Sequence, residues 1–145
     1  MSKERSVVVT GGSGFIGSNV CKTFVESGWN VINIDKRKRE MEGVTQYTFE
    51  VDNKQVQGIL KLIKPDVVIH TAANNSVPDS LINTRVTYTD NVYATISLLI
   101  TVLMQELRTL YLHQAVVCTE QVYMKMGPLK RQTQRHQSIR MAEPK

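Results

Sequence analysis

The sequence predicts an α/β protein built on a doubly wound parallel sheet. Three observations support this prediction. Short β-branched runs alternate with segments in which apolar residues recur at helical spacing. A glycine-rich turn, with Gly11, Gly14 and Gly17, separates the first apolar run from the first amphipathic segment. An acid, Asp35, closes the second apolar run, at the end of a strand where such sheets bind their ligands.

The first strand is predicted over residues 6–10, an apolar run that stops at glycines, and the first helix over residues 15–27. The later segments repeat this alternation, with strands over residues 31–34, 46–51, 66–71 and 110–118 and helices over residues 55–63 and 84–108. The charged residues 36–43 and the stretch 77–80 are expected to be loops. Repeated alternation at this spacing favours parallel strands connected by helices.

The periodicity ends at Tyr123, so we expect one domain over residues 1–123 and a basic, irregular tail over residues 124–145. The sheet would then be truncated after about five strands, with the fifth as an uncovered edge and with no substrate domain. Residues 125–145 hold six basic residues and one acid, which accounts for the whole net charge of +5. Because the rest of the chain is neutral and these residues include no aromatic, nucleic-acid binding is not expected.

The sequence favours a cytoplasmic protein. Residues 92–107 form the most apolar stretch, but polar side chains interrupt it, and we expect it to be too short and too polar to span a bilayer. No signal peptide is expected before the first strand. The two cysteines, Cys21 and Cys118, show neither the spacing of a metal site nor a disulfide framework.

The turn after the first strand has the pattern G-x-x-G-x-x-G. Gly11 permits the tight turn, Gly14 lets the backbone approach a pyrophosphate, and Gly17 lets the helix pack close to the strand. The N-terminus of the helix offers unpaired N–H groups to the phosphates. The turn therefore predicts a dinucleotide site of the Rossmann type.

Asp35 indicates which dinucleotide binds. A carboxylate in this position accepts hydrogen bonds from the adenosine ribose hydroxyls and repels a 2′-phosphate, which favours NAD over NADP. Lys36 and Arg37 follow directly and soften this discrimination. The predicted cofactor is NAD.

Four segments, in order, resemble the extended short-chain dehydrogenase/reductases of the NAD-dependent epimerase/dehydratase type. They are TGGSGFIG at residues 10–17, PDVVIHTAA at 65–73, YTDNVYATISLL at 88–99 and VVCTEQVY at 116–123. Residues 76–80, with Asp90 and Asn91, are most like UDP-glucose 4-epimerases, whereas residues 119–123 are closer to nucleotide-sugar 4,6-dehydratases. The resemblance implies oxidation of a sugar hydroxyl by hydride transfer to NAD, with a nucleotide sugar as substrate.

The resemblance also implies which residues contact the cofactor. They would be Gly11, Gly14, Phe15, Ile16, Gly17, Asp35, Lys36, Asp52, Thr71, Ala72, Ala73 and Asn91. Asp52 would bind the adenine amino group, with Glu50 as the alternative, and Asn91 would brace the long helix near the nicotinamide. Asn75 stands where epimerases often carry a lysine.

The same resemblance assigns catalytic roles to Thr119, which would polarise the sugar hydroxyl, and to Lys145. In this family a tyrosine takes the hydroxyl proton, and a lysine four residues later lowers its pKa. The sequence has no Tyr-x-x-x-Lys. The closest candidate, ending at Lys145, carries Met141 in place of the tyrosine, and a thioether cannot transfer that proton. Gln121 likewise stands where a dehydratase has its glutamate.

Two polar or reactive side chains have plainer interpretations. His70 is interpreted as a packed histidine at the end of a strand rather than as a base. Cys118 is interpreted as a small core residue rather than as a nucleophile.

Three hypotheses remain open on function. The chain is a truncated or diverged epimerase or dehydratase, or a catalytically silent NAD-binding module that regulates or pairs with a full-length homologue, or a structural remnant without a ligand. The resemblance also implies a homodimer through the helix at residues 84–108, whose apolar face otherwise lacks a partner.

Overall fold

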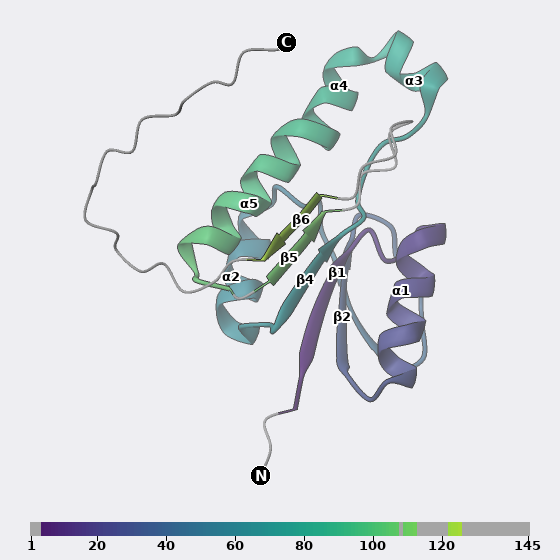
Figure 1. Cartoon of the computed structure of the whole chain (residues 1–145). Helices are drawn as coiled ribbons and strands as arrows, with labels where there is room; N and C mark the ends of the chain where they lie inside the picture. Colours follow the sequence, from purple (N-terminus) through teal and green to yellow (C-terminus); the bar gives the residue numbers. More distant parts are fainter. Residues whose placement is uncertain (1–3, 108, 113–121, 126–145) are drawn as a thin grey trace, which may run out of the picture.

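The computed structural model describes residues 4–107, 109–112 and 122–125. In these residues six strands form one sheet in the order β3-β2-β1-β4-β5-β6 (Figure 1). The strands are β1 (Ser6–Thr10), β2 (Asn30–Asp35), β3 (Val44–Thr48), β4 (Val67–His70), β5 (Thr109–Leu112) and β6 (Val122–Lys125). The first five are parallel, as the sequence predicts.

The chain reverses its direction of winding between β1 and β4. From β1 it moves outward to β2 and β3, and then returns to the other side of β1 with β4. Val8, in the middle of β1, lies opposite Ile32 on one side and Val68 on the other. In doubly wound sheets such a switch point opens a crevice at the carboxyl ends of the strands, which is where ligands bind.

Helices cover both faces of the sheet. The helix α1 (Phe15–Glu26) lies on one side, and α2 (Lys54–Ile63) and α5 (Ala94–Met104) lie on the other (Figure 1). Side chains alternate between the faces of a strand, so each face has its own core. The α1 side buries Val7, Val9, Cys21 and Val31, and the opposite side buries a larger cluster that includes Val8, Leu60, Leu98, Val102 and Leu110.

Two elements differ from the sequence prediction. Strand β3 begins at Val44, two residues before the predicted start, because it pairs with Val31 directly after the turn at Gly43, whose φ is +72°. It ends at Thr48, opposite Asp35, which leaves residues 49–51 outside the strand. The stretch 77–80, expected to be a loop, belongs to a short helix, α3 (Val77–Ile82).

The edge of the sheet beyond β5 also differs. The fifth strand was expected over residues 110–118 as an uncovered edge, with no further strand after it. The structure has β5 at Thr109–Leu112 and pairs it with an antiparallel β6, in which Met124 lies opposite Leu110. The prediction of about five parallel strands is confirmed, but the expectation that the fifth strand is a bare edge with no strand beyond it is wrong. The first two residues of the predicted tail, residues 124–125, belong to β6.

The long helix predicted over residues 84–108 is present over Thr84–Met104 and contains a π-helical turn in the middle. It consists of α4 (Thr84–Tyr88), a π-helical turn η1 (Thr89–Tyr93) and α5. The helix has 21 residues and contains an 18-residue window with a mean hydropathy of 1.2, of which 28% is buried, so by length and composition alone it could cross a membrane, contrary to the expectation from residues 92–107. Core helices of soluble proteins pass the same test, and Leu98 and Val102 of this helix are buried against the sheet.

Candidate functional site

The glycine turn leaves β1 at the switch point and leads directly into α1. Gly11 has a φ of +78°, and a Cβ atom there would lie 2.6 Å from the Cα of Ala72. A Cβ atom on Gly17 would lie 2.7 Å from the Cα of Gly12 and still closer to the carbonyl oxygen of Gly11. Backbone therefore fills the space that a side chain would need at Gly11 and Gly17, as the sequence predicts for both.

Gly14 is less crowded, although a side chain would not fit there without a small shift. The nearest atoms to a Cβ placed there are the carbonyl oxygen of Gly11 at 3.2 Å and a guanidinium nitrogen of Arg37 at 3.8 Å. Gly14 is also the N-cap of α1, and no side chain caps the helix. The first N–H groups of α1 are thus presented beside a bare backbone, which is the arrangement that binds phosphate.

A cleft with a volume of about 660 Å³ opens at this point, along the carboxyl ends of the strands. Its size falls in the ordinary range for cofactor sites. The lining includes these predicted cofactor residues: Gly11, Gly14, Phe15, Ile16, Gly17, Asp35, Lys36, Asp52, Thr71, Ala72 and Ala73. The structure thus brings eleven of the twelve predicted residues to one cavity, and the bare glycine backbone with the uncapped helix fits a dinucleotide.

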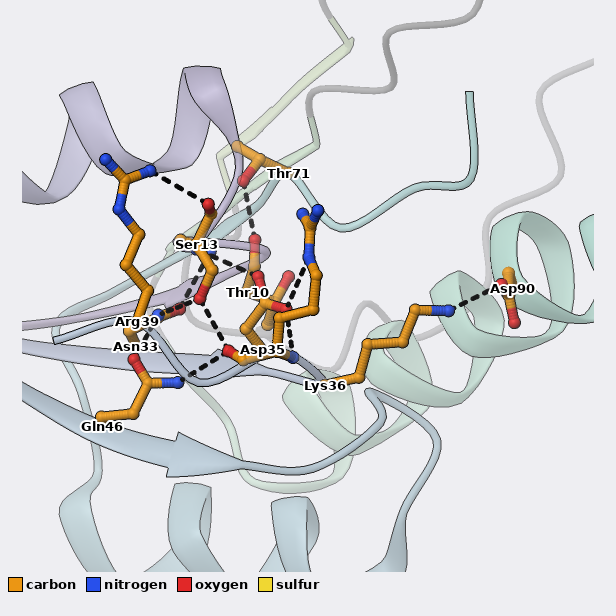
Figure 2. A network of polar contacts seen from close by, with 11 residues as sticks. Thr10, Ser13, Asn33, Asp35, Lys36, Arg39, Gln46, Thr71 and Asp90 are labelled. Carbon is orange, nitrogen blue, oxygen red and sulfur yellow. Dashed lines mark hydrogen bonds and ion pairs between the residues drawn. The ribbon is translucent and has the colours of Figure 1, made fainter. Parts of the chain in front are cut away.

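Asp35 sits at the rim of this cleft with only 4% of its side chain exposed. Its Oδ2 accepts a hydrogen bond from the backbone N–H of Ser13 (3.0 Å), and its Oδ1 accepts one from the N–H of Arg37 (2.8 Å). The carboxylate therefore ties the glycine turn to the end of β2 (Figure 2). An ionised carboxylate has about four lone-pair sites, so acceptor capacity remains for a ligand.

Asn33 is a further organising residue, which the sequence analysis missed. It is fully buried, and its Oδ1 accepts a hydrogen bond from the N–H of Gly12 (2.9 Å) while its amide donates to Oε1 of Gln46 (2.8 Å). Figure 2 shows Asn33 and Gln46 next to Ser13 on the turn. The signal was present in the sequence, because an asparagine inside the apolar run of β2 needs partners for its polar atoms.

An ion pair crosses the cleft. Nζ of Lys36, at the end of β2, lies 3.1 Å from Oδ2 of Asp90 on η1, and both residues line the cavity (Figure 2). The two residues are 54 positions apart in the sequence. The pair joins opposite walls of the site, although the exposure of Lys36 keeps its contribution to stability small.

Asn91, on η1, braces the loop that follows β4. Its Oδ1 accepts a hydrogen bond from the N–H of Asn74 (2.6 Å), and its Nδ2 donates to the carbonyl oxygen of Asn74 (2.8 Å). Asn91 is buried and does not line the cleft itself. The residue thus holds the loop that carries Ala72 and Ala73, and it is the one predicted cofactor residue that lies outside the cavity lining.

His70 is packed at the end of β4, as predicted. It is fully buried, with Nδ1 2.6 Å from Oγ1 of Thr10 and Nε2 2.9 Å from Oγ1 of Thr95. The Thr95 hydroxyl already donates to the carbonyl oxygen of Asn91, so it accepts from Nε2–H, and Thr10 donates to Nδ1. Burial lowers the pKa of His70 from 6.5 to about 4, which keeps the ring neutral.

Comparison with known proteins agrees with this geometry. The model of the NAD dependent epimerase/dehydratase family matches residues 7–140, which is most of the chain. The chain belongs to this family. The cofactor predicted from the sequence agrees with the family's description, and the predicted fold class agrees with solved UDP-glucose 4-epimerase structures.

Individual members of the family are similar over the same region. The chain is 34% identical over 107 residues to a dTDP-glucose 4,6-dehydratase of Haemophilus influenzae, covering 65% of this chain and 32% of that protein. It is 34% identical over 99 residues to a UDP-glucose 4-epimerase of Halalkalibacterium halodurans, covering 65% and 30%. The Thermus thermophilus UDP-glucose 4-epimerase in complex with NAD superposes with a TM-score of 0.68 at 28% identity, covering 72% of this chain and 36% of that one.

The chain spans about a third of the length of the curated relatives that it matches. Both kinds of enzyme suggested by the sequence, epimerase and dehydratase, are among them. The comparisons therefore support the family and leave the sugar chemistry open between these two.

The remaining predicted residues of an epimerase/dehydratase site fall into two groups. Glu50, Asp52 and Asn75 all line the cleft, so the structure does not choose between the two acids for the adenine contact. Cys118, Thr119, Gln121, Met141 and Lys145 lie outside the described residues. Among the described residues no group of histidine, cysteine or acidic side chains is arranged to hold a metal ion.

Proposed function

We propose that this chain binds NAD(H) in the cleft at the carboxyl ends of β1, β2 and β4, as the cofactor domain of a nucleotide-sugar epimerase or dehydratase. The observation that carries the proposal is the turn itself. Backbone atoms lie within 3 Å of a Cβ placed at Gly11 or Gly17, whereas at Gly14, the N-cap of α1, the nearest atom lies 3.2 Å away. Packing alone therefore demands glycine less strictly at Gly14, and the close approach of a pyrophosphate to the backbone accounts for a glycine there.

The other contacts follow from the lining of the cleft. The N–H groups at the start of α1 would bind the pyrophosphate, and Asp35 would accept a hydrogen bond from the adenosine ribose. Asp52 or Glu50 would contact the adenine. Thr71, Ala72 and Ala73 would run beside the nicotinamide half, on the loop that Asn91 holds.

A Gly14→Ala substitution tests this proposal. The new methyl group would stand at the start of α1, where the pyrophosphate approaches the backbone, so we expect the affinity for NADH to fall by at least about tenfold, or about 1.4 kcal/mol. The fold needs only a shift of a few tenths of an ångström at the carbonyl oxygen of Gly11. NADH fluorescence and calorimetric titration of the full chain measure the affinity.

Gly58→Ala is the matched control. Gly58 lies in α2, and a Cβ atom there would meet nothing within 4 Å, so this variant should bind NADH as the wild type does and gain about 0.5–1 kcal/mol of stability. Wild-type protein that binds no NADH, or a Gly14→Ala variant that binds as well as Gly58→Ala, would contradict the proposal.

We further propose that the chain does not convert a nucleotide sugar by itself. The sequence has no Tyr-x-x-x-Lys to supply the base, and neither a thioether at Met141 nor an amide at Gln121 transfers a proton. Incubation with NAD and UDP-glucose should therefore give no UDP-galactose.

Thr119 and Lys145 remain proposed site residues on the strength of the family resemblance. The protein acts in the cytoplasm and binds neither nucleic acid nor membrane in this proposal.

A homodimer is the partner that the surface favours. Tyr93, Ile96, Ile100 and Leu103 follow one another at spacings of three and four residues along the helix, and 41–58% of each residue is exposed. This is the spacing of a helix–helix seam. A second copy would bury the stripe.

The oligomeric state tests the dimer. Light scattering after gel filtration should show a dimer for the wild type and a monomer for Ile100→Glu. Leu62→Glu, on an exposed site of α2, is the control and should leave the dimer intact. A wild-type monomer at micromolar concentration would count against the homodimer and would leave the NAD proposal untouched.

A further inference from the structure

Four basic residues in succession, Lys36 to Arg39, follow the acid that ends β2. In an NAD-specific site the carboxylate in this position faces the adenosine ribose and repels a 2′-phosphate, whereas a nearby arginine accommodates that phosphate. The balance between Asp35 and its basic neighbours therefore decides which dinucleotide is accepted. The structure shows how each of the four is engaged.

The two lysines are directed elsewhere. Nζ of Lys36 lies 3.1 Å from Asp90 across the cleft, and Nζ of Lys38 lies 3.4 Å from Glu40, with 72% of the Lys38 side chain exposed. Lys38 does not line the cleft. Both ammonium groups are thus paired with acids, so we do not assign the phosphate contact to the lysines.

Arg37, by contrast, lines the cleft. Its Nη2 lies 3.8 Å from the position of a Cβ on Gly14, at the start of α1, and its Nε lies 3.8 Å from Oδ1 of Asp35. With 69% of its side chain exposed, Arg37 is accessible to a ligand in the cleft. A guanidinium group carries five N–H donors, and the pair with one carboxylate oxygen at 3.8 Å leaves most of them available for a phosphate.

The carboxylate of Asp35 is held in place by the backbone. Only 4% of its side chain is exposed, and each of its oxygens already accepts a backbone N–H bond, from Ser13 and from Arg37. Arg39 approaches the same turn from the other side, where its Nη1 donates to the carbonyl oxygen of Ser13 (3.1 Å) (Figure 2). Two guanidinium groups therefore lie near this acid: that of Arg37 beside the carboxylate itself, and that of Arg39 on the turn to which the carboxylate is bonded.

We propose that this chain accepts NADP(H) as well as NAD(H), and that the guanidinium of Arg37 binds the 2′-phosphate of the adenosine ribose. This inference rests on the proposed function, because it concerns the same cleft. It makes Arg37 the residue that determines cofactor specificity.

Titration of the full-length chain with NADH and with NADPH tests the inference. We expect the two dissociation constants to lie within about tenfold of each other in the wild type. In Arg37→Ala, the affinity for NADPH should fall by at least about tenfold, as expected for the loss of a charged phosphate contact, while that for NADH changes less than about twofold. Lys38→Ala, one residue away and exposed, is the matched control and should change neither affinity by more than about twofold.

The results of these titrations distinguish a failure of the proposed function from a failure of the inference on NADP(H). If neither dinucleotide binds, the proposed function fails. If NADH binds and NADPH binds more than about tenfold more weakly, the inference alone fails. If Arg37→Ala weakens both dinucleotides equally, the guanidinium contacts the shared pyrophosphate instead, and the inference is again overturned. A loss confined to NADPH, and larger at low ionic strength, supports it.

Discussion

Acidification should destabilise this protein through His70 before its carboxylates titrate. The ring is fully buried at the junction of β1, β4 and α5, where it accepts from Thr10 and donates to Thr95. Neutral imidazole satisfies both bonds. A proton added at Nδ1 would meet the Thr10 hydroxyl, which now donates, and would place a charge in an apolar interior.

The size of the effect follows from the pKa. Burial lowers the pKa of His70 from 6.5 to about 4, so between these values the unfolded chain binds the proton and the folded chain does not. Stability is therefore complete above pH 6.5 and is lost as the pH falls toward 4. The full difference corresponds to about 3 kcal/mol, of which about 2 kcal/mol should disappear between pH 7 and pH 5.

Urea unfolding followed by circular dichroism measures this loss. The free energy of unfolding should be determined at intervals from about pH 7 to pH 5, a window in which few ordinary carboxylates titrate. His70→Asn removes the titrating ring, so this variant should be less stable at pH 7 and should show a flat profile across the window. His113→Gln and His136→Gln, which remove the other two imidazoles, are the matched controls and should keep the wild-type slope.

Two results would refute this reasoning. One is a wild-type unfolding free energy that stays constant from pH 7 to pH 5. The other is a His70→Asn variant that loses stability as steeply as the wild type, because the proton uptake would then belong to another group.

Three further substitutions test the packing. Gly17→Ala drives a methyl group against the backbone of Gly11 and Gly12, so it should cost about 1–3 kcal/mol or more in urea unfolding. Leu98→Ala empties a fully packed position between α5 and the sheet and should cost about 2–5 kcal/mol by the same assay. Asn91→Ala leaves the N–H and carbonyl of Asn74 unpaired, so it should lower the melting temperature and increase hydrogen exchange at that loop.

The parts of the fold that were predictable from sequence are those fixed by neighbouring residues. The turn from β1 into α1 was predicted with its glycines in place because a strand end, a positive φ and a helix start are all encoded within residues 6–17. The limits of β3 were not, because they depend on pairing with β2 across the sheet. The antiparallel β6 was missed for the same reason, since its partner β5 is about ten residues away and residues 124–125 have no strand pattern of their own.

The site shows the same division. Gly11, Gly14 and Asp35 belong to a local sequence pattern that predicts dinucleotide binding. The ion pair between Lys36 and Asp90 joins residues 54 positions apart, and neither segment has a sequence feature that predicts contact with the other. Asn33 lies between these cases, because a buried amide in an apolar strand predicts that it has partners but does not say which ones.

Cofactor binding and hydride transfer draw on different parts of this chain, so the two can fail separately. The residues that line the cleft all lie between Gly11 and Ala94, on α1, β2, η1, α5 and the loops that follow β1, β2, β3 and β4. The proton-transfer groups that the family resemblance assigns begin only at Thr119. A measured affinity for NADH would therefore test the cleft itself, and a lack of sugar turnover cannot stand in for that measurement.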